Sequence, residues 1–238
     1  MNYIESEWRK LLIKIINEGK LNKKDDSEVL EILGYNTFVK NPINDFVDQN
    51  SNAFLHSVQD GWYDVEGYVM TGESIAQYMD GMNDSKIIHC YDYDDGFVYT
   101  YPERFLSMRI GDKSDNNILV NQLDVIIKRL RDNIGTNRAV AHFYNCGLDK
   151  DEVDIPCLQF LQATVRDDKL QIHIIFRSND IFGAWVSNMF LIMYIGLIIC
   201  DSLREEHPNI SFEGVDYHVS SAHIYKTDLG MAKKIIEG

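Results

Sequence analysis

Residues 156–180 read PCLQFLQATVRDDKLQIHIIFRSND, and this stretch decides the fold. In its second half every other residue from Leu170 to Phe176 is apolar, which is typical of a β-strand with one buried face. The pattern predicts two strands, at 158–165 and 170–176, with a short polar connection between them. Strands joined by so short a connection are antiparallel neighbours, so we expect a β-hairpin.

Helical patterns and further strands surround this hairpin. The most apolar run, at 189–200, is too short to span a bilayer and predicts a long buried helix from about 185 to 203. The amphipathic pattern at 118–131 predicts a helix that Asn116 or Asn117 caps. Further helices are predicted at 4–17, 74–79 and 229–236, and further strands at 34–40, 139–144 and 215–225. The polar residues 41–60 predict no regular element, and 91–96 predict an acidic turn.

These elements predict a single domain over residues 1–238. The chain is 45% hydrophobic, which is ordinary for a globular protein, and it shows no repeat, linker or low-complexity segment. Strands mixed with helices in this order indicate an α+β fold. We expect a mixed or largely antiparallel sheet packed against helices, with the long buried helix at the centre.

The charge balance excludes several classes of partner. The chain has 23 basic and 37 acidic residues, a net charge of −14, whereas nucleic acid and anionic membranes are bound by basic faces. A small anionic ligand must therefore be held by a few local Arg or Lys residues. The N-terminus lacks the charged-then-apolar pattern of a signal peptide, so we expect a cytoplasmic protein.

The cysteines are widely spaced along the chain. They are Cys90, Cys146, Cys157 and Cys200, with no CxxC pair. This spacing suggests neither a zinc site nor a disulfide framework, so we expect no metal and reduced thiols.

Cys157 stands where a proline-containing loop enters the first strand of the hairpin. A lone cysteine is more often an inert buried residue than a nucleophile, and a nucleophilic one needs a nearby cation. The hairpin supplies a candidate, because it brings the start of its first strand beside the end of its second, where Arg177 lies. The alternative for Arg177 is a surface ion pair.

Three polar residues further along are weaker signals. Asn188 opens the long apolar helix, where it either caps the helix or presents a donor and an acceptor to the edge of a base. His223 and Tyr225 are two apart on a predicted strand and therefore point to one face, although core His and Tyr are common.

The candidate residues follow one another in a recognisable order. They are Asn145, Pro156-Cys157, Arg177-Ser178, Asp180, Gly183, Asn188 and His223-x-Tyr225. This order and spacing resemble the thymidylate synthase family, as do the segment 121–145 and the opening helix that ends at Glu18-Gly19. The resemblance covers nearly the whole chain, strongly from 121 to 225 and weakly from 25 to 96.

This resemblance implies a function. Family thymidylate synthases convert dUMP to dTMP with methylene-tetrahydrofolate as co-substrate, and a cysteine thiolate attacks C6 so that C5 becomes nucleophilic. It also implies a homodimer and a thymidylate synthase-like fold. An alternative within the family is a pyrimidine nucleotide 5-hydroxymethylase acting on dUMP, dCMP or CMP. A third possibility is a non-catalytic nucleotide-binding relative.

The resemblance further implies a role for each matching residue. Cys157 matches the nucleophile, and Arg177 matches the arginine that contacts both thiolate and phosphate. Glu66 matches the glutamate that organises proton transfer, and Tyr99 or Tyr101 matches the active-site tyrosine. The substrate-binding matches are Ser178 and the partner-contributed Arg138 for phosphate, Asn188 for a uracil edge, and His223 and Tyr225 for the deoxyribose. Asp180 and Gly183 match the folate-side loop.

The chain also departs from the family pattern. Leu158 follows the nucleophile where a His is usual, which resembles a short archaeal-type branch. Asp25-Asp26-Ser27 stands in place of the N-terminal phosphate arginine, so we expect Lys23 or Lys24 to take part in its place. The sequence stops thirteen residues after Tyr225, without the family's closing tail. Without that tail water could add and yield a hydroxymethyl product, so two alternatives stay open: a thymidylate synthase that closes with another loop, and a nucleotide 5-hydroxymethylase.

Overall fold

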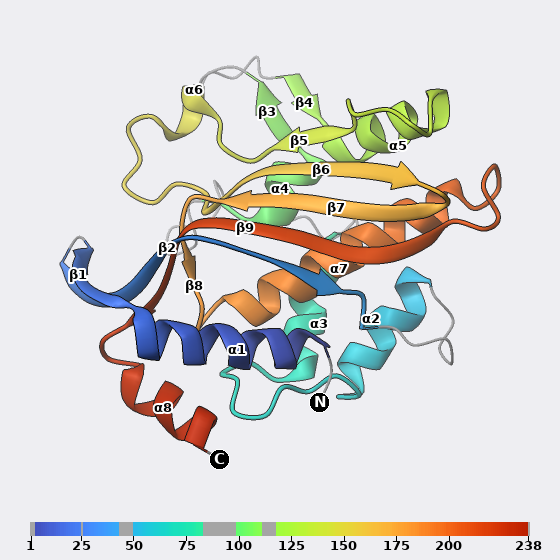
Figure 1. The fold of residues 1–238 in the computed structure, drawn as a ribbon. Helices are drawn as coiled ribbons and strands as arrows, with labels where there is room; N and C mark the ends of the chain where they lie inside the picture. The colour runs from blue at the N-terminus through green and yellow to red at the C-terminus, as the bar shows by residue number, and fades with distance from the viewer. Residues whose placement is uncertain (1–2, 25, 43–49, 83–98, 111–117, 238) are drawn as a thin grey trace.

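The computed structural model describes residues 3–24, 26–42, 50–82, 99–110 and 118–237 (Figure 1). Its helices are α1 (Tyr3–Glu18), α2 (Ser51–Gln59), α3 (Gly72–Asp80), α4 (Tyr101–Leu106), α5 (Gln122–Asp132), α6 (Cys146–Asp149), α7 (Trp185–Leu203) and α8 (Leu229–Glu237). Its strands are β1 (Lys20–Lys24), β2 (Ser27–Lys40), β3 (Met108–Ile110), β4 (Ile118–Val120), β5 (Val140–His142), β6 (Leu158–Arg166), β7 (Lys169–Phe176), β8 (Asn179–Asp180) and β9 (Ser211–Tyr225).

The main sheet is mixed, as the α+β expectation requires. Over the described residues its order is β1-β2-β9-β7-β6-β5, with β8 paired to β9. The strands β7 and β9 are parallel, and β8 also runs parallel to β9, whereas the other neighbours are antiparallel. The expected fold class is therefore confirmed.

The predicted hairpin is present as β6 and β7. Its register runs from Leu158 opposite Phe176 to Arg166 opposite Lys169. The two turn residues between the strands, Asp167 and Asp168, have φ of 49° and 58°. Positive φ at both central positions is the geometry of a type I′ turn, whose twist matches that of the flanking strands. The turn therefore sets the register as far as Phe160 opposite Ile175, and a shift of one residue beyond that point places Leu158 opposite Phe176 at the open end.

The helix α7 connects β8 to β9 in the chain and lies at the centre of the molecule. It packs on the sheet through β7 and β9 and is covered by α1, α2, α3 and α5 (Figure 1). The helix is long and apolar enough to cross a membrane, yet most of its residues are buried inside the protein. Gly196 lets the helix approach the sheet closely, since a Cβ there would lie 2.5 Å from the ring of Phe212. It is the expected buried core helix.

The start of α5 differs from the expectation. The predicted helix at 118–131 begins only at Gln122, because Asn121 is the cap and its side chain accepts the N–H of Asp124. The apolar residues before it form β4, which pairs with β3. The caps expected at Asn116 or Asn117 lie outside the described residues.

Other boundaries also moved. The strand expected at 34–40 begins at Ser27 and pairs along its length with β9. The polar segment expected to be irregular contains α2, which Asn50 caps through the N–H of Ala53. The acidic turn expected at 91–96 lies outside the described residues.

Candidate active site

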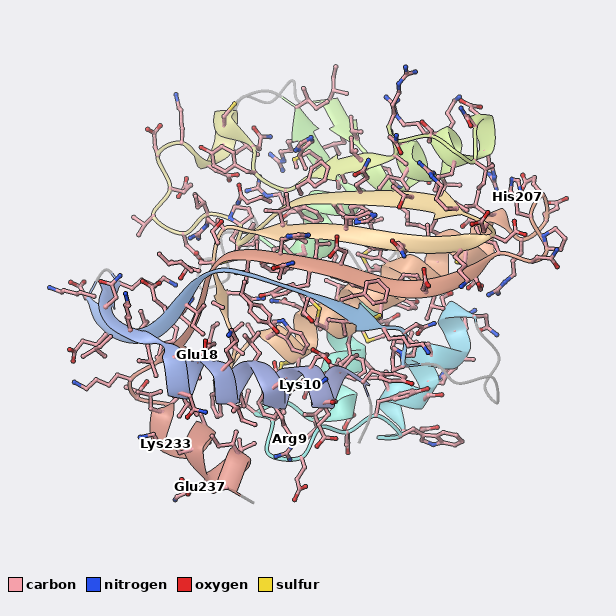
Figure 2. All side chains as sticks on the ribbon, in the orientation of Figure 1. Arg9, Lys10, Glu18, His207, Lys233 and Glu237 are labelled. Atoms are coloured by element: carbon pink, nitrogen blue, oxygen red, sulfur yellow. The ribbon has the colours of Figure 1, made fainter. Side chains whose placement is uncertain are left out.

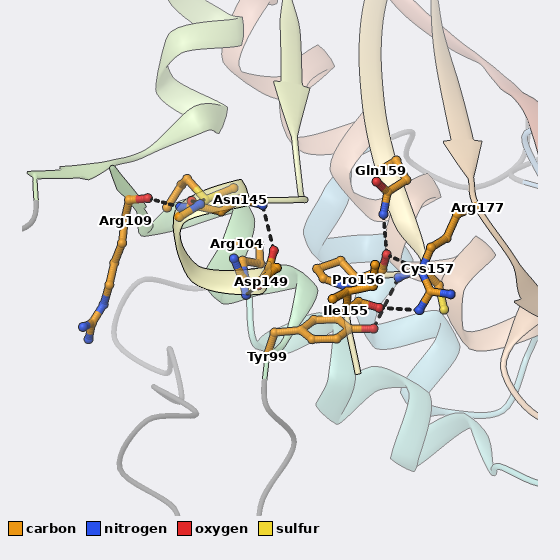
Figure 3. Close-up of polar contacts among 12 residues, drawn as sticks. Tyr99, Arg104, Arg109, Asn145, Asp149, Ile155, Pro156, Cys157, Gln159 and Arg177 are labelled. Carbon is orange, nitrogen blue, oxygen red and sulfur yellow. Dashed lines mark hydrogen bonds and ion pairs between the residues drawn. The ribbon is translucent and has the colours of Figure 1, made fainter. Parts of the chain in front are cut away.

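The open end of the hairpin places Cys157 and Arg177 side by side. The Arg177 N–H donates to the Cys157 carbonyl at 2.8 Å. The guanidinium turns back onto the loop before the cysteine, where Nη2 donates to the Ile155 carbonyl at 2.6 Å and Nε to the Pro156 carbonyl at 3.1 Å (Figure 3). Arg177 thus fixes the main chain that presents the thiol.

Ser178 links the cation to the thiol. Arg177 Nη1 donates to Ser178 Oγ at 3.2 Å, and the same Oγ lies 3.6 Å from Cys157 Sγ. Because Oγ accepts from the guanidinium, its own proton is free to be donated to sulfur. No carboxylate of the described residues lies within ion-pair distance of Arg177, so it is not the surface ion pair of the alternative interpretation.

Two tyrosines hold the entry into β6. The Cys157 N–H donates to Tyr99 Oη at 3.3 Å, and the Leu158 N–H donates to Tyr101 Oη at 3.1 Å. Burial raises the pKa of both phenols, and the neighbouring Cys157 raises that of Tyr99 further. Both stay protonated at neutral pH. Of the two candidates, Tyr99 is the one that contacts the cysteine itself.

A buried ion pair supports this side of the site. Arg104 Nη2 lies 2.5 Å from Asp149 Oδ1, and the other oxygen of Asp149 accepts the Asn145 N–H at 2.7 Å (Figure 3). The Arg104 guanidinium also lies 5.9 Å from the centre of the Tyr99 ring. The pairing of Arg104 with Asp149 was not predicted, because the two residues are 45 positions apart in sequence.

Asn188 is buried and belongs to a chain of polar groups. Its Nδ2 donates to Asn179 Oδ1 at 3.4 Å, and Asn179 Nδ2 donates to Tyr217 Oη at 3.2 Å. The cap of α7 is Ala184, which excludes the capping alternative for Asn188. With Nδ2 tied to Asn179, the Asn188 Oδ1 and one remaining N–H can face a ligand. Asn179 and Tyr217 were missed as polar partners of this residue.

His223 and Tyr225 lie together at the end of β9, as the strand spacing predicts. Their ring centroids are 5.2 Å apart, and Lys24 Nζ lies 3.0 Å from His223 Nε2 and 3.4 Å from Tyr225 Oη. Burial, followed by the charge of Lys24, lowers the pKa of His223 from 6.5 to about 4. The imidazole is therefore neutral and accepts from the ammonium.

Asp180 and Gly183 form one tight turn beside His223, which pairs with Asp180 across β8 and β9. Asp180 Oδ1 accepts the N–H groups of Phe182 and Gly183, both at 3.1 Å. A Cβ at Gly183 would lie 2.5 Å from Asp180 Oδ2, so the turn requires glycine there. Burial raises the pKa of Asp180. Oδ2 makes no hydrogen bond to the described residues and can accept from N–H donors of a ligand.

The structure does not bring Glu66 to this group. Its side chain is 91% exposed and lies 3.7 Å from that of Arg9, which Figure 2 shows on the side of α1 that faces away from the sheet. Nothing in this arrangement supports a catalytic role for Glu66, which stays a prediction.

Arg138 is exposed and also lies apart from Cys157. The neighbouring Ala139 carbonyl accepts from Ala163 on β6, six residues beyond Cys157. At about 3.3 Å per residue, Arg138 is roughly 20 Å from the thiol of its own chain.

The other described cysteines make no hydrogen bond to Cys157, Ser178 or Arg177. Cys146 is exposed and Cys200 is buried, where burial raises the pKa of its thiol to about 12. Cys90 lies outside the described residues. In the part of the chain that the structure describes, no group of three or more His, Cys, Asp and Glu could hold a metal ion.

Comparison with known proteins identifies relatives of this arrangement. The family model described as thymidylate synthase matches residues 75–237. A protein of Methanothermobacter thermautotrophicus named "Putative thymidylate synthase" is 27% identical over all of this chain and 97% of its own length. Proteins of the same name from Methanothermobacter marburgensis and Methanocaldococcus jannaschii are 28% and 26% identical, over 98% and 93% of this chain and 95% and 87% of their own.

Proposed function

The chain belongs to the thymidylate synthase family, and from that premise we propose that it methylates C5 of dUMP through covalent attack by Cys157. The family is one of transferases with nucleotide and folate substrates. The observation that carries the finer proposal is the contact series Cys157–Ser178–Arg177. It joins a thiol, a hydroxyl and a cation at one point of the fold.

Cys157 would act as the nucleophile. Its thiolate forms a bond to C6 of the pyrimidine, and the electron pair of the C5–C6 double bond moves toward O4, so that C5 gains carbanion character. Ser178 can donate its proton to sulfur in the free site, and Arg177 adds a fixed positive charge beside it. After C5 has bonded to the one-carbon unit, loss of the C5 proton to water and elimination of the thiolate would restore the C5–C6 double bond and free the enzyme.

Tyr99 and Arg177 would keep the nucleophile in place. Both bind the main chain around Cys157, Tyr99 through the cysteine N–H and Arg177 through the two preceding carbonyls. Because the phenol of Tyr99 stays protonated, its O–H remains available to donate a hydrogen bond into the site. Preorganised donors of this kind stabilise charge that develops in a transition state.

The substrate's other parts have candidate partners. Asn188 offers an acceptor and a donor that suit the N3–H and O4 of uracil. Ser178 and Arg177 would bind the phosphate, and His223 with Tyr225 would bind the sugar hydroxyl. Arg138 would reach the phosphate of a partner subunit in a homodimer.

Asp180 and Gly183 would hold the folate. The fit rests on Asp180 Oδ2, an oxygen of a half-buried carboxylate that suits the N–H groups of a pterin, beside a glycine that leaves no side chain in the way. When bound, methylene-tetrahydrofolate supplies the one-carbon unit and, for a methyl product, the reducing hydride.

Product mass spectrometry tests the proposal. The purified chain is incubated with methylene-tetrahydrofolate and, separately, dUMP, dCMP or CMP. We expect dTMP from dUMP, no product from Cys157→Ser, and normal turnover from Cys146→Ser as a matched cysteine control. A product heavier than dTMP by one oxygen atom would favour the hydroxymethylase. Binding without any product would favour a non-catalytic relative. Full activity in Cys157→Ser would contradict covalent attack by Cys157.

A further inference from the structure

The long helix α7 begins without a cap of its own. Its N-cap residue is Ala184, whose side chain cannot accept a hydrogen bond. The first N–H groups of a helix have no partner within the helix, and a buried N–H that stays unpaired is unfavourable. Asn188 follows directly on this first turn, so the place where the helix starts determines where the Asn188 side chain lies.

Tyr68 supplies the missing cap from a distant part of the chain. Its Oη accepts the Ser187 N–H at 3.3 Å and donates to the Gly183 carbonyl at 2.9 Å. The same oxygen lies 3.1 Å from Ser187 Oγ, and Ser187 is buried. One hydroxyl therefore bonds the main chain before and after the helix start, 115 and 119 residues further along the sequence.

The ring of Tyr68 is fixed by its neighbour Trp8 on α1. The two rings meet edge to face, with centroids 5.6 Å apart and an angle of 85° between their planes. Trp8 is fully buried, and its Nε1 donates to the Ile181 carbonyl at 2.6 Å. The two aromatic side chains together hold residues 181–187 at three main-chain groups.

The main chain next to Tyr68 is held from the other side. Gly67 has φ of 79°, and a Cβ there would lie 2.8 Å from Ile235 of α8. Arg9 of α1 donates to the Ile235 carbonyl at 2.5 Å and to the Glu66 carbonyl at 3.5 Å. Because residues 66–68 are fastened between α1 and α8, the hydroxyl of Tyr68 has a fixed place relative to the sheet and helices.

We propose that Tyr68 is a positioning residue of the candidate active site. Its hydroxyl determines where Asn188, the candidate reader of the base, lies relative to the turn that ends at Gly183. Without the hydroxyl, the Ser187 N–H and the Gly183 carbonyl lose their partner and the first turn of α7 can open. The proposal rests on the proposed function, to which it adds a residue that does not itself contact the substrate.

Three variants separate this hydroxyl from the other parts of the contact. Tyr68→Phe removes the hydroxyl and keeps the ring that packs on Trp8. Ser187→Ala removes the neighbouring hydroxyl and leaves both main-chain bonds of Tyr68 in place. Tyr194→Phe is the matched control, because Tyr194 is a buried tyrosine of the same helix whose hydroxyl makes no hydrogen bond to the described residues.

Hydrogen exchange of the main-chain amides tests the positioning without any ligand. Exchange in the free protein is followed by mass spectrometry of peptides that cover residues 181–190. We expect exchange about tenfold faster there in Tyr68→Phe, because a hydrogen bond to the helix start is lost. We expect Ser187→Ala and Tyr194→Phe to exchange at nearly the wild-type rate.

Nucleotide binding tests the consequence for the site. Each protein is titrated calorimetrically with dUMP and with dCMP. In Tyr68→Phe we expect the ratio of the two dissociation constants to move about five- to tenfold closer to one, because a loosened helix start lets the Asn188 carboxamide adapt to either base. A purely structural role would lower stability and leave this ratio unchanged.

Three results would overturn the proposal. The first is unchanged exchange over residues 181–190 in Tyr68→Phe. The second is faster exchange with an unchanged ratio, which would make Tyr68 a structural residue only. The third is an equal effect in Tyr194→Phe, which would mean that any lost hydroxyl on this helix acts in the same way. If wild type binds neither nucleotide, or both equally, the proposed base recognition fails instead, and hydrogen exchange alone decides whether Tyr68 positions the start of α7.

Discussion

His223 titrates far below the range of an ordinary histidine. It is 1% exposed, and burial together with Lys24 lowers its pKa from 6.5 to about 4. At pH values between about 4 and 6.5, His223 is protonated in the unfolded chain and neutral in the folded chain. The stability that depends on the neutral imidazole is therefore complete above about pH 6.5 and is lost as the pH falls toward 4, by roughly 3 kcal/mol at most.

Urea unfolding at pH 7 and pH 4.5 checks this prediction. Wild type is compared with His223→Gln, which cannot titrate, so that the effect of all other groups cancels in the difference. We expect the stability advantage of wild type to shrink by about 2 kcal/mol at the lower pH. A difference that does not change with pH would show that His223 is protonated equally in both states.

The hydrogen bonds of Asn188 predict that the site prefers uracil to cytosine. With its Nδ2 donating to Asn179, it can still accept from uracil N3–H and donate to O4, whereas cytosine reverses both roles. We expect dUMP to bind more tightly than dCMP, since a mismatched buried polar contact costs about 1–3 kcal/mol. Asn188→Asp, an acceptor at both atoms when ionised, should shift the ratio of the two dissociation constants toward dCMP. Tighter binding of dCMP by wild type would contradict the assignment.

Residue-level contacts could be predicted only where local topology determined them. The nearness of Cys157 and Arg177 follows from a hairpin with a short turn, whereas the register shift between Leu158 and Phe160 that sets their pairing was not predicted. The partner of His223 does not follow in this way, because Lys24 is 199 residues away and meets it only once β2 has paired with β9. Tyr217 was missed for the same reason, because it lies 38 residues from Asn179, its partner in the polar chain of Asn188.

The predicted boundaries of helices and strands were wrong where tertiary contacts overrode the local sequence pattern. Ile118 and Leu119 extend the apolar spacing of α5 backward, yet both are exposed and pair with β3 as a strand. The polar segment that contains α2 gave no periodic signal, although Phe54 and Val58 bury one face of that helix. Elements with a strong intrinsic pattern, such as α7 and the β6–β7 hairpin, were predicted nearly to the residue.

The conformation of the β6–β7 turn lowers the free energy of unfolding, and this effect can be tested. Asp167 and Asp168 both have positive φ, a region that aspartate tolerates but that glycine adopts without cost. Replacing the pair by Asn-Gly should stabilise the protein by about 1 kcal/mol, because the new residues match the required geometry. Urea unfolding measures the change. Asp151→Gly is the control, since Asp151 has no positive φ, and it should give no stabilisation. Equal gains from both variants would contradict the turn argument.

At the scale of the whole molecule, the candidate site of one chain is short of positive charge. Arg177 and Lys24 approach it, while Arg138, which the family resemblance assigns to the phosphate, is exposed roughly 20 Å from Cys157 of its own chain. We therefore propose that Arg138 serves the reaction in another subunit. A two-fold dimer would supply it reciprocally, because each chain would give its Arg138 to the other's site.

Mixing two inactive variants tests that arrangement. Arg138→Ala should lose most activity because the partner's phosphate loses a charge-assisted contact, and Cys157→Ser should lose activity because the nucleophile is gone. Each chain retains what the other lacks, so a hybrid dimer contains one complete site, built from Cys157 of one subunit and Arg138 of its partner. Random exchange of subunits should restore about one quarter of wild-type activity. The mixture is incubated until analytical ultracentrifugation of labelled chains shows exchange. A monomer in that measurement, or exchanged dimers without activity, would mean that Arg138 does not act across an interface.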